Sequence, residues 1–331
     1  MSWGNKSKEL TAEEAIAIAR EELAPYWFGS DPLLIGLEQG GGYQAFPLNR
    51  DFVKKLWLIL IVDPTTFLGE SILDLIREWE KRYRVLSLNV LVIYSVRYQF
   101  QKNPRAAQRW IEGEATTCVR CVDVNSRLVS AFHATDLPKV LLFREGVRLF
   151  EYIGKNWIFE TDFQIHKALR MADPGLPLPP VLQGLDHLTL DTQMVDLNST
   201  TLGFPGLSLL GNWSHDEEKI WTNDEDARLN FRSFGSEVAL LARPKEESDS
   251  TPTLVVELNG LPPYDAVRGS SLRVSESSDL VASLNGLNLF SILTELPTHE
   301  RNVTVRFKNI KECPIEIYGL RFGEKMRVSD L

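Results

Sequence analysis

The feature that most constrains this chain is an uninterrupted apolar run, Leu56 to Val62, followed at once by a turn and a helix pattern. Its seven residues, Leu-Trp-Leu-Ile-Leu-Ile-Val, predict a buried strand. The next four residues, Asp63 to Thr66, have the composition of a turn, and residues 70–83 carry apolar side chains at helical spacing. A chain with this strand, turn and helix in succession is expected to build an α/β domain.

Strand and helix patterns continue to alternate through the first half of the chain. Alternation of this kind implies parallel strands joined by crossovers. The last two strands are separated by only three residues, so they are expected to pair as an antiparallel hairpin before a closing helix completes an α/β sandwich. In chain order, the expected elements are a helix over 11–24, a strand over 56–62, a helix over 70–83, a strand over 86–94, a helix over 104–112, a strand over 117–124, a short helix over 126–134, strands over 139–143 and 147–153, and a helix over 160–170.

The composition of the sequence changes after Asp173, where four of the next seven residues are prolines. Because proline continues neither a helix nor a central strand, this stretch is predicted to be a linker. Beyond about residue 205, short alternating runs separated by turns predict an all-β sandwich. The predicted organisation is an N-terminal extension packed on the first domain (1–50), an α/β domain (51–172), a Pro-rich linker (173–204), a β-sandwich (205–325) and a tail (326–331).

The composition narrows the classes of function. With 331 residues, of which 44% are hydrophobic and 24% charged, the chain has enough apolar material for two packed domains. Its net charge is −9 and no basic stripe stands out, which argues against nucleic acid as a partner. No stretch approaches the roughly 18 apolar residues of a membrane span, and no signal segment is recognised, so a cytoplasmic protein is expected. Its three cysteines are expected to be reduced thiols.

The first domain resembles the thioredoxin-like proteins. The segments 121–125, 128–132 and 137–146 are similar to the family's third strand, short helix and final hairpin, with Pro138 at the position of its cis-proline. The layout is that of the peroxiredoxin-like and TlpA-like members, in which an extra strand and helix follow the nucleophile loop. By this resemblance the Leu137–Pro138 peptide is cis and faces the turn at Thr66.

The redox motif of that family is missing. Family members carry a Cys-x-x-Cys where the turn meets the helix, because the helix dipole stabilises a thiolate there. Here the four positions read Thr66-Phe67-Leu68-Gly69. A redox-inactive domain is therefore expected, and Thr66 is interpreted as an N-cap or turn residue.

The second half resembles the β-sandwich that follows thioredoxin in the soluble part of DipZ-type thiol-disulfide proteins. The similarity rests on residues 210–213, 227–231, 238–242 and 318–323. It implies that a thioredoxin-like α/β sandwich is followed by an all-β, jelly-roll-like sandwich.

The preferred functional prediction is a binding cleft without catalysis. In the thioredoxin-like family, backbone groups beside the proline pair with an extended substrate. The resemblance therefore implies a peptide-facing surface formed by Thr65, Thr66, Phe67, Leu137 and Pro138. A peptide or a protein of unknown identity is the expected partner, and no cofactor and no metal ion are expected.

Thiol–disulfide exchange through Cys118 and Cys121 is the alternative from the enzyme class. These residues form a Cys-x-x-Cys, but they lie at the start of a predicted strand, where residues three apart point to opposite faces. Structural or incidental cysteines are therefore the favoured interpretation. A zinc site would need scattered ligands, because the remaining Cys313 lies in the other predicted domain.

Aromatic residues of the second half suggest carbohydrate binding as a further alternative. Trp221 and Tyr264 are the candidates for a platform on which a sugar ring stacks, whereas Trp213 is expected to be buried. The acidic residues 216–218 and 224–226 lack the spacing of a known calcium-binding loop and are expected to form a solvated surface.

Overall fold

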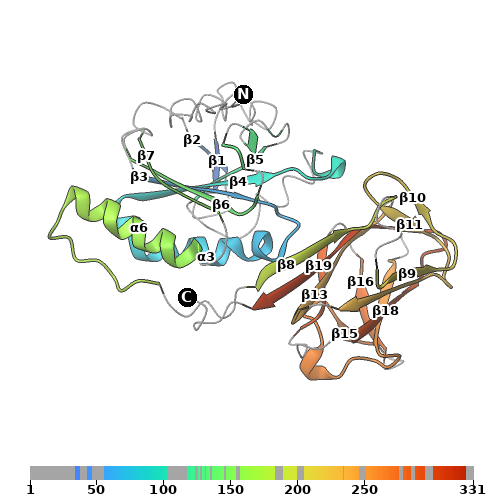
Figure 1. Cartoon of the computed structure of the whole chain (residues 1–331). Coiled ribbons are helices and arrows are strands. Elements are labelled where there is room, and N and C mark those ends of the chain that lie inside the picture. Colours follow the sequence, from blue (N-terminus) through green and yellow to red (C-terminus); the bar gives the residue numbers. More distant parts are fainter. Residues whose placement is uncertain are drawn as a thin grey trace, which may run out of the picture. The chain divides into compact units, whose positions relative to one another are not determined.

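The structure is a computed structural model of the whole chain (Figure 1). The helices expected over 11–24 and 104–112 lie outside the residues that it describes. Of the short helix expected over 126–134, it describes residues 126, 129–130 and 132–134, and the backbone is helical at 129–130. The described residues are 34–37, 43–46, 56–102, 118–123, 126, 129–130, 132–134, 136–144, 147–153, 157–182, 189–199, 205–233, 235–245, 251–275, 279–284, 288–294 and 301–325.

The chain divides into two compact units. The N-terminal unit comprises Met1–Pro64, Gly69–Leu185 and Val328–Leu331. The C-terminal unit comprises Asp186–Arg327 together with the short segment Thr65–Leu68. The division after Leu185 falls inside the stretch that the sequence predicts as a linker.

A seven-stranded sheet forms the centre of the N-terminal unit, with the strands in the order β2-β1-β5-β4-β3-β6-β7. The central strands β5, β4 and β3 run parallel. At one edge β6 and β7 form an antiparallel hairpin, and at the other edge β1 and β2 form a second one. The bounds are β1 (Leu34–Leu37), β2 (Tyr43–Phe46), β3 (Leu56–Val62), β4 (Leu88–Ser95), β5 (Val119–Asp123), β6 (Lys139–Arg144) and β7 (Val147–Ile153).

Two long helices, α3 (Phe67–Tyr83) and α6 (Trp157–Ala172), lie side by side along one face of this sheet (Figure 1). Trp79 of α3 and Trp157 of α6 meet edge to face with their ring centres 6.0 Å apart, and both are buried. Short 3-10 helices, η2 (Arg84–Leu86) and η3 (Gln99–Lys102), follow α3 and β4. In the part of the chain that the structure describes, no helix is both long enough and apolar enough to cross a membrane.

In the described residues between 56 and 172, the structure confirms the five predicted strands and the two predicted long helices. The elements β3 to β7, α3 and α6 all begin and end within three residues of the predicted bounds. All seven residues of β3 are buried, as its apolar run predicts. The strands β1 and β2 were not predicted: they lie in the N-terminal extension, and β1 adds to the central sheet by pairing with β5.

Two antiparallel sheets of six strands each build the C-terminal unit. In the first, the order is β10-β11-β19-β13-β17, and β8 also pairs with β19. In the second, the order is β15-β16-β14-β18-β12-β9. The bounds are β8 (Thr189–Asp196), β9 (Leu207–Leu210), β10 (Ser214–His215), β11 (Ile220–Thr222), β12 (Arg228–Ser233), β13 (Glu237–Pro244), β14 (Thr253–Leu258), β15 (Arg273–Val274), β16 (Leu280–Ser283), β17 (Asn288–Leu293), β18 (Arg301–Lys308) and β19 (Ile315–Lys325), with one 3-10 helix, η4 (Asp265–Val267).

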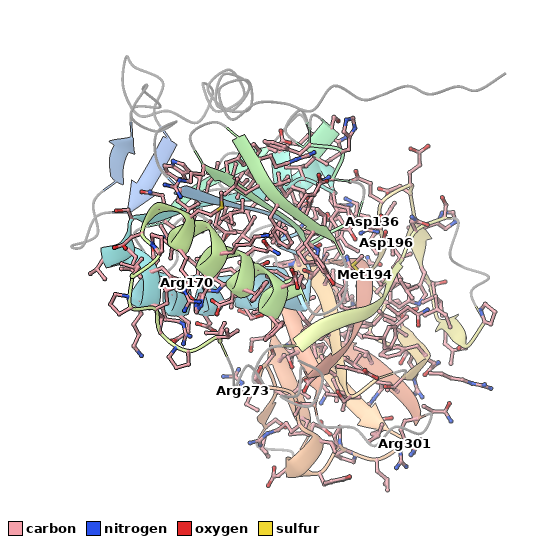
Figure 2. The ribbon with its side chains drawn as sticks, turned by 60° about the vertical axis from the view of Figure 1, so that its left-hand side comes forward. Asp136, Arg170, Met194, Asp196, Arg273 and Arg301 are labelled. Carbon is pink, nitrogen blue, oxygen red and sulfur yellow. The ribbon has the colours of Figure 1, made fainter. Side chains whose placement is uncertain are left out.

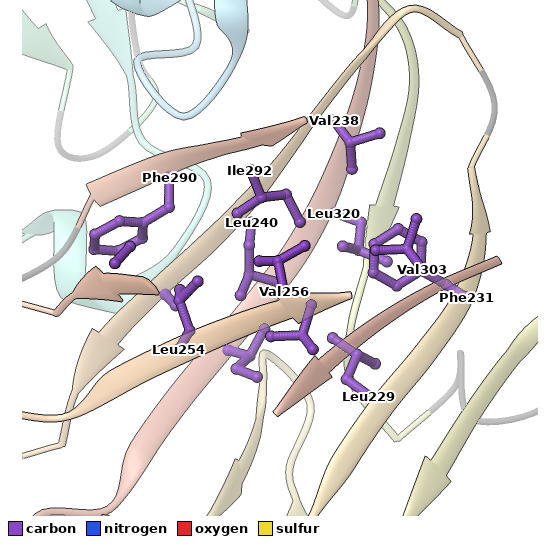
Figure 3. Close-up of a cluster of buried hydrophobic side chains, with 14 of the residues drawn as sticks. Leu229, Phe231, Val238, Leu240, Leu254, Val256, Phe290, Ile292, Val303 and Leu320 are labelled. Atoms are coloured by element: carbon purple, nitrogen blue, oxygen red, sulfur yellow. The ribbon is translucent and has the colours of Figure 1, made fainter. Parts of the chain in front are cut away.

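Side chains from both sheets meet in one hydrophobic core (Figure 3). Leu240 and Ile292 reach it from the first sheet, and Val256 and Val303 from the second. Along β18 buried and less buried residues alternate, because successive side chains of a strand point to opposite faces. The second half of the chain is therefore built from strands, as its alternating pattern predicts.

Strand β8 lies inside the segment 173–204, for which the sequence predicts a linker. It pairs antiparallel with the last strand, from Thr189 opposite Lys325 to Asp196 opposite Gly319. The prolines that suggest a linker end at Pro180, before the strand begins. Strand β8 is not evident from the sequence, because its partner β19 lies more than a hundred residues further along the chain. The short strands β9, β10, β11, β15 and β16 were not predicted either.

Candidate functional site

Pro138, one residue of the predicted cleft, lies directly before β6 and beside the end of β3. The register pairs Ile61 of β3 with Lys139 of β6, so Pro138 lies one position beyond the ladder, level with Val62 at the end of β3. The Leu137–Pro138 peptide is cis, as the resemblance implies. The fold thus brings the proline to the same end of the sheet as the turn that follows β3.

The five predicted cleft residues differ in exposure. Thr65, Thr66 and Phe67 are buried, whereas Leu137 and Pro138 are half-buried. Because α3 begins at Phe67, Thr66 stands at the N-cap position. Its hydroxyl cannot replace a thiolate in disulfide exchange, since that reaction proceeds by attack of one sulfur on another.

Gly69 packs against the backbone of the turn before α3. A Cβ atom at this position would lie 1.9 Å from the carbonyl oxygen of Asp63 and 2.8 Å from the Cα atom of Pro64. These separations are far below van der Waals contact between non-bonded heavy atoms, so any side chain would require the backbone to shift. Gly69 stands at the position of the second cysteine in the Cys-x-x-Cys of thioredoxin-like proteins. In this backbone there is no room for a cysteine side chain at that position.

Charged groups that the sequence analysis did not single out occupy the same end of the sheet. Arg97 places a guanidinium nitrogen 3.7 Å from Oδ2 of Asp63, which is buried. Lys139 is also buried; its Nζ donates to the carbonyl oxygen of His133 at 3.3 Å and lies 2.5 Å from Oε1 of Glu151. The position of Asp63 directly after an apolar strand was a usable signal, because the carboxyl ends of parallel strands meet at one edge of a sheet.

The two cysteines of the alternative prediction lie at the start of β5. Cys118 immediately precedes the strand and is buried. Cys121 lies within the strand and is paired in register with Ile93 of β4. Reactive cysteines are partly exposed, so exchange through Cys118 would first require this thiol to become accessible.

The predicted aromatic residues of the C-terminal unit occupy three different surroundings. Trp213 is half-buried rather than buried as expected, and it meets Phe307 edge to face with ring centres 5.8 Å apart. Trp221 on β11 is half-buried, and Nζ of Lys245 lies 5.6 Å from its ring centre. Tyr264 is 60% exposed. Of the two candidate stacking residues, Tyr264 has the more accessible ring.

The acidic residues near Trp221 stabilise their own loop. Asp224 accepts hydrogen bonds from the backbone nitrogens of Asn212 at 2.8 Å and Asp226 at 2.9 Å. These bonds favour the ionised form and lower the pKa of Asp224. Among the described residues, no group of three or more His, Cys, Asp or Glu side chains is arranged to hold a metal ion.

A buried carboxylate in the C-terminal unit is held by two cations. Glu316 on β19 lies 2.6 Å from Nζ of Lys219 and accepts a hydrogen bond from Nε of Arg243 at 2.6 Å. The hydroxyl of Tyr318 donates to the same carboxylate at 3.0 Å. Burial by itself raises the pKa of Glu316, but the hydrogen bond from Lys219 and the charge of Arg243 outweigh it and hold the pKa below its usual value. Burial raises the pKa of Tyr318.

A buried carboxylate in the N-terminal unit is held by neutral donors. Asp162 on α6 accepts hydrogen bonds from the indole of Trp79 at 3.2 Å, the hydroxyl of Tyr83 at 2.7 Å and the backbone nitrogen of Leu182 at 2.7 Å. Burial, followed by the hydrogen bond to Asp162, raises the pKa of Tyr83. Burial also lowers the pKa of the neighbouring His166, although the charge of Asp162 opposes this shift.

No protein-family model matches the chain, and no curated protein matches its sequence. Among solved structures, a family two carbohydrate esterase from Cellvibrio japonicus is 9% identical with a TM-score of 0.31, over 41% of this chain and 34% of the esterase. A thioredoxin-like protein in the oxidized form is 16% identical with a TM-score of 0.32, over 42% of this chain and 95% of that protein. The carbohydrate-binding module CBM36, in complex with calcium and xylotriose, is 6% identical with a TM-score of 0.25, over 39% of this chain and 97% of the module.

These structural neighbours each match only part of the chain. The chain spans about a third of the length of the esterases that it matches. With identities below 25% and TM-scores below 0.5, the similarities assign neither a family nor an activity to the chain.

Proposed function

We propose that this chain is a non-catalytic, DipZ-like protein in which a thioredoxin-like domain precedes a jelly-roll-like sandwich. Its role is to bind an extended peptide segment of a partner protein. The binding residues are Thr65, Thr66, Phe67, Leu137 and Pro138, at the end of the sheet where β3 stops and β6 starts.

The observation that carries this proposal is the junction between β3 and α3. A hydroxyl residue, Thr66, stands in front of the helix where exchange chemistry needs a thiolate. Three residues later, a side chain at Gly69 would meet the carbonyl oxygen of Asp63 at 1.9 Å. The residue types at positions 66 and 69 and the close packing around Gly69 therefore both argue against a Cys-x-x-Cys at this turn. This supports a binding role over disulfide exchange.

The low cysteine content supports a reducing location such as the cytoplasm. The chain has three cysteines among 331 residues, whereas secreted proteins more often carry a set of disulfides.

The first test asks whether the chain catalyses thiol–disulfide exchange. Reduction of insulin by dithiothreitol is measured with and without the full chain, and the expected rate is that of dithiothreitol alone. The Cys121→Ser variant is run in parallel. Catalysis by the parent that this variant abolishes would overturn the proposal in favour of exchange through Cys118 and Cys121.

The second test addresses peptide binding. Ten-residue peptides are selected from a random display library on the full chain, and the affinity of an enriched peptide is measured by calorimetry. Leu137→Asp is expected to weaken binding about tenfold or more, because a carboxylate placed in a half-buried contact loses solvation. The matched control is Val85→Asp on η2, where the parent side chain is 87% exposed.

The two variants of the second test distinguish peptide binding at the proposed cleft from peptide binding elsewhere on the chain. Unchanged affinity in Leu137→Asp would remove the cleft assignment. Equal losses in both variants would mean that the added charge acts at a distance and that the peptide binds elsewhere.

Carbohydrate binding by the C-terminal unit is the second candidate function, favoured by the exposed ring of Tyr264. A glycan array probed with the parent and with Tyr264→Ala and Trp221→Ala tests it. Binding that Tyr264→Ala abolishes would support this function, and identical array profiles for all three proteins would exclude these two residues as the platform.

A further inference from the structure

A cavity of about 640 Å³ lies in the N-terminal unit between α6 and the chain segment that follows it. Its volume falls within the range of sites that bind small molecules. Residues 178–181 form one wall, and the other is a single face of α6, since its members are spaced by three, four, seven and eight positions. The helix wall consists of Phe163, His166, Lys167, Arg170 and Met171.

The two walls are tied together by buried polar contacts. Asp162 on α6 is fully buried and accepts a hydrogen bond at 2.7 Å from the backbone nitrogen of Leu182, directly after the segment wall. Arg82 of α3 donates to the carbonyl oxygen of Pro180, within that wall. The segment therefore has fixed anchor points at and beside the cavity, and the cavity is formed in advance of any ligand.

His166 brings a positioned imidazole to the cavity lining. Its side chain is largely buried, and its Nε2 lies 2.7 Å from the hydroxyl of Tyr83. Because Tyr83 gives its single hydroxyl proton to Asp162 at 2.7 Å, Nε2 is the donor in the bond between His166 and Tyr83. With its proton on Nε2, the neutral imidazole is only an acceptor at Nδ1, so the side chains of this lining that can bind an anion are Lys167 and Arg170.

The lining combines apolar and basic side chains. Phe163 is 48% exposed and Met171 is 64% exposed, although side chains of this size are usually buried. Lys167 and Arg170 lie on the same helix face between them, and Figure 2 labels Arg170 on α6. None of the described residues that line the cavity is acidic. Such a surface is complementary to a ligand that has an apolar body and a negative head.

We propose that this cavity binds a small amphipathic anion, of which a medium-chain carboxylate is the simplest example. The apolar body packs against Phe163, Met171 and the proline-rich wall at 178–181. The anionic head is bound by Lys167 and Arg170, which form charge-assisted hydrogen bonds with it. This site is separate from the proposed peptide cleft and does not depend on it.

Calorimetric titration of the full chain with decanoate tests the proposal, with decyltrimethylammonium as a cationic ligand of the same chain length. Saturable binding of decanoate and none of the cation is the expected result. Equal binding of both ligands, or no saturable binding of decanoate, would overturn it. Vesicles of anionic phospholipid form a further arm: binding to vesicles without binding of decanoate would point to a membrane surface and overturn the small-ligand assignment.

Two variants locate the site. Lys167→Gln combined with Arg170→Gln is expected to weaken decanoate binding about tenfold or more, because two charge-assisted contacts are lost. Both side chains are exposed, so the variant is expected to fold. Lys81→Gln on α3 is the matched control, since Lys81 is exposed and lies outside the cavity lining. An unchanged affinity in the double variant, or an equal loss in the control, would overturn the site.

Discussion

Each unit of this protein buries one carboxylate against a tyrosine, and the two carboxylates are satisfied in opposite ways. Asp162 in the N-terminal unit is fully buried and accepts its hydrogen bonds from neutral groups, including the hydroxyl of Tyr83. Glu316 in the C-terminal unit is nearly as buried, but it faces the cationic side chains of Lys219 and Arg243.

Different interactions therefore stabilise the two buried carboxylates. The cations around Glu316 still reach solvent, with 20% of the Lys219 side chain and 30% of the Arg243 side chain exposed, so salt and a change of charge act on them directly. Among the described residues, the hydrogen-bond donors to Asp162 are neutral, and the imidazole of His166, whose pKa is lowered by burial, lies 3.8 Å away, so this carboxylate depends on complete hydrogen bonding. Loss of a single buried partner leaves a polar group unsatisfied there.

The largest effect is expected from Asp162→Ala. Trp79, Tyr83 and the backbone of Leu182 would all lose their acceptor, which should lower the free energy of unfolding by about 3 kcal/mol or more. Urea unfolding followed by tryptophan fluorescence measures the change. Asp226→Ala, at an exposed position, is the control, and a similar small loss in both variants would contradict the assignment of Asp162 as the centre of the cluster.

A smaller effect is expected from Glu316→Gln. The amide still accepts a hydrogen bond, but Lys219 and Arg243 lose their counter-charge, so a loss of about 1–2 kcal/mol is expected at low salt. In 1 M NaCl the Debye length falls to about 3 Å, and because Lys219 and Arg243 are partly exposed the loss should shrink, although only modestly for contacts of 2.6 Å. Asp162→Ala, measured in the same two salt concentrations, should keep its loss. Salt dependence of the same size in both variants would break the comparison.

The two tyrosines offer a finer contrast. Tyr83→Phe removes the hydroxyl that links Asp162 to His166. Tyr318→Phe leaves Glu316 with two cationic donors. We expect Tyr83→Phe to cost about 1 kcal/mol more than Tyr318→Phe in the same urea experiment. Equal costs would mean that the neutral cluster tolerates a missing partner as well as the charged one does.

The smallest effect is a pH dependence, with different windows for the two units. Burial lowers the pKa of His166 below 6.5, so as the pH falls below 6.5 the unfolded chain binds a proton that the folded chain refuses, and stability decreases. The pKa of Glu316 is also lowered, so its contribution is present above pH 4.5 and is lost as the pH falls through the folded value.

One titrating group changes the unfolding free energy by at most about 1.4 kcal/mol per pH unit. Between pH 8 and pH 4, the free energy of unfolding measured in urea should therefore begin to decrease slowly as the pH falls below about 6.5. This decrease is expected to disappear in His166→Gln and to remain in Glu316→Gln. Loss of the upper step in Glu316→Gln instead would contradict this assignment.

Local pattern was sufficient for much of the first unit and for less of the second. The apolar run of β3 and the periodicity of α3 and α6 lie within each segment itself, so the sequence predicts them without knowledge of their partners. The strand β8 carries no such continuous signal, and its place in a sheet depends on pairing with β19. The chemistry missing from the turn at Thr66 could also be predicted, because it depends on residue type alone.

What the sequence by itself determined is therefore the set of strong local elements and the absence of a thiol before α3. Only the tertiary structure decided which distant groups meet. The register of β3 and β6 places Pro138 level with Val62, the turn at Asp63 leaves no space for a side chain at Gly69, and Leu182 reaches Asp162. The physical reason is that close packing and hydrogen bonding join residues far apart in the chain, and such pairs leave no periodic trace in a single sequence.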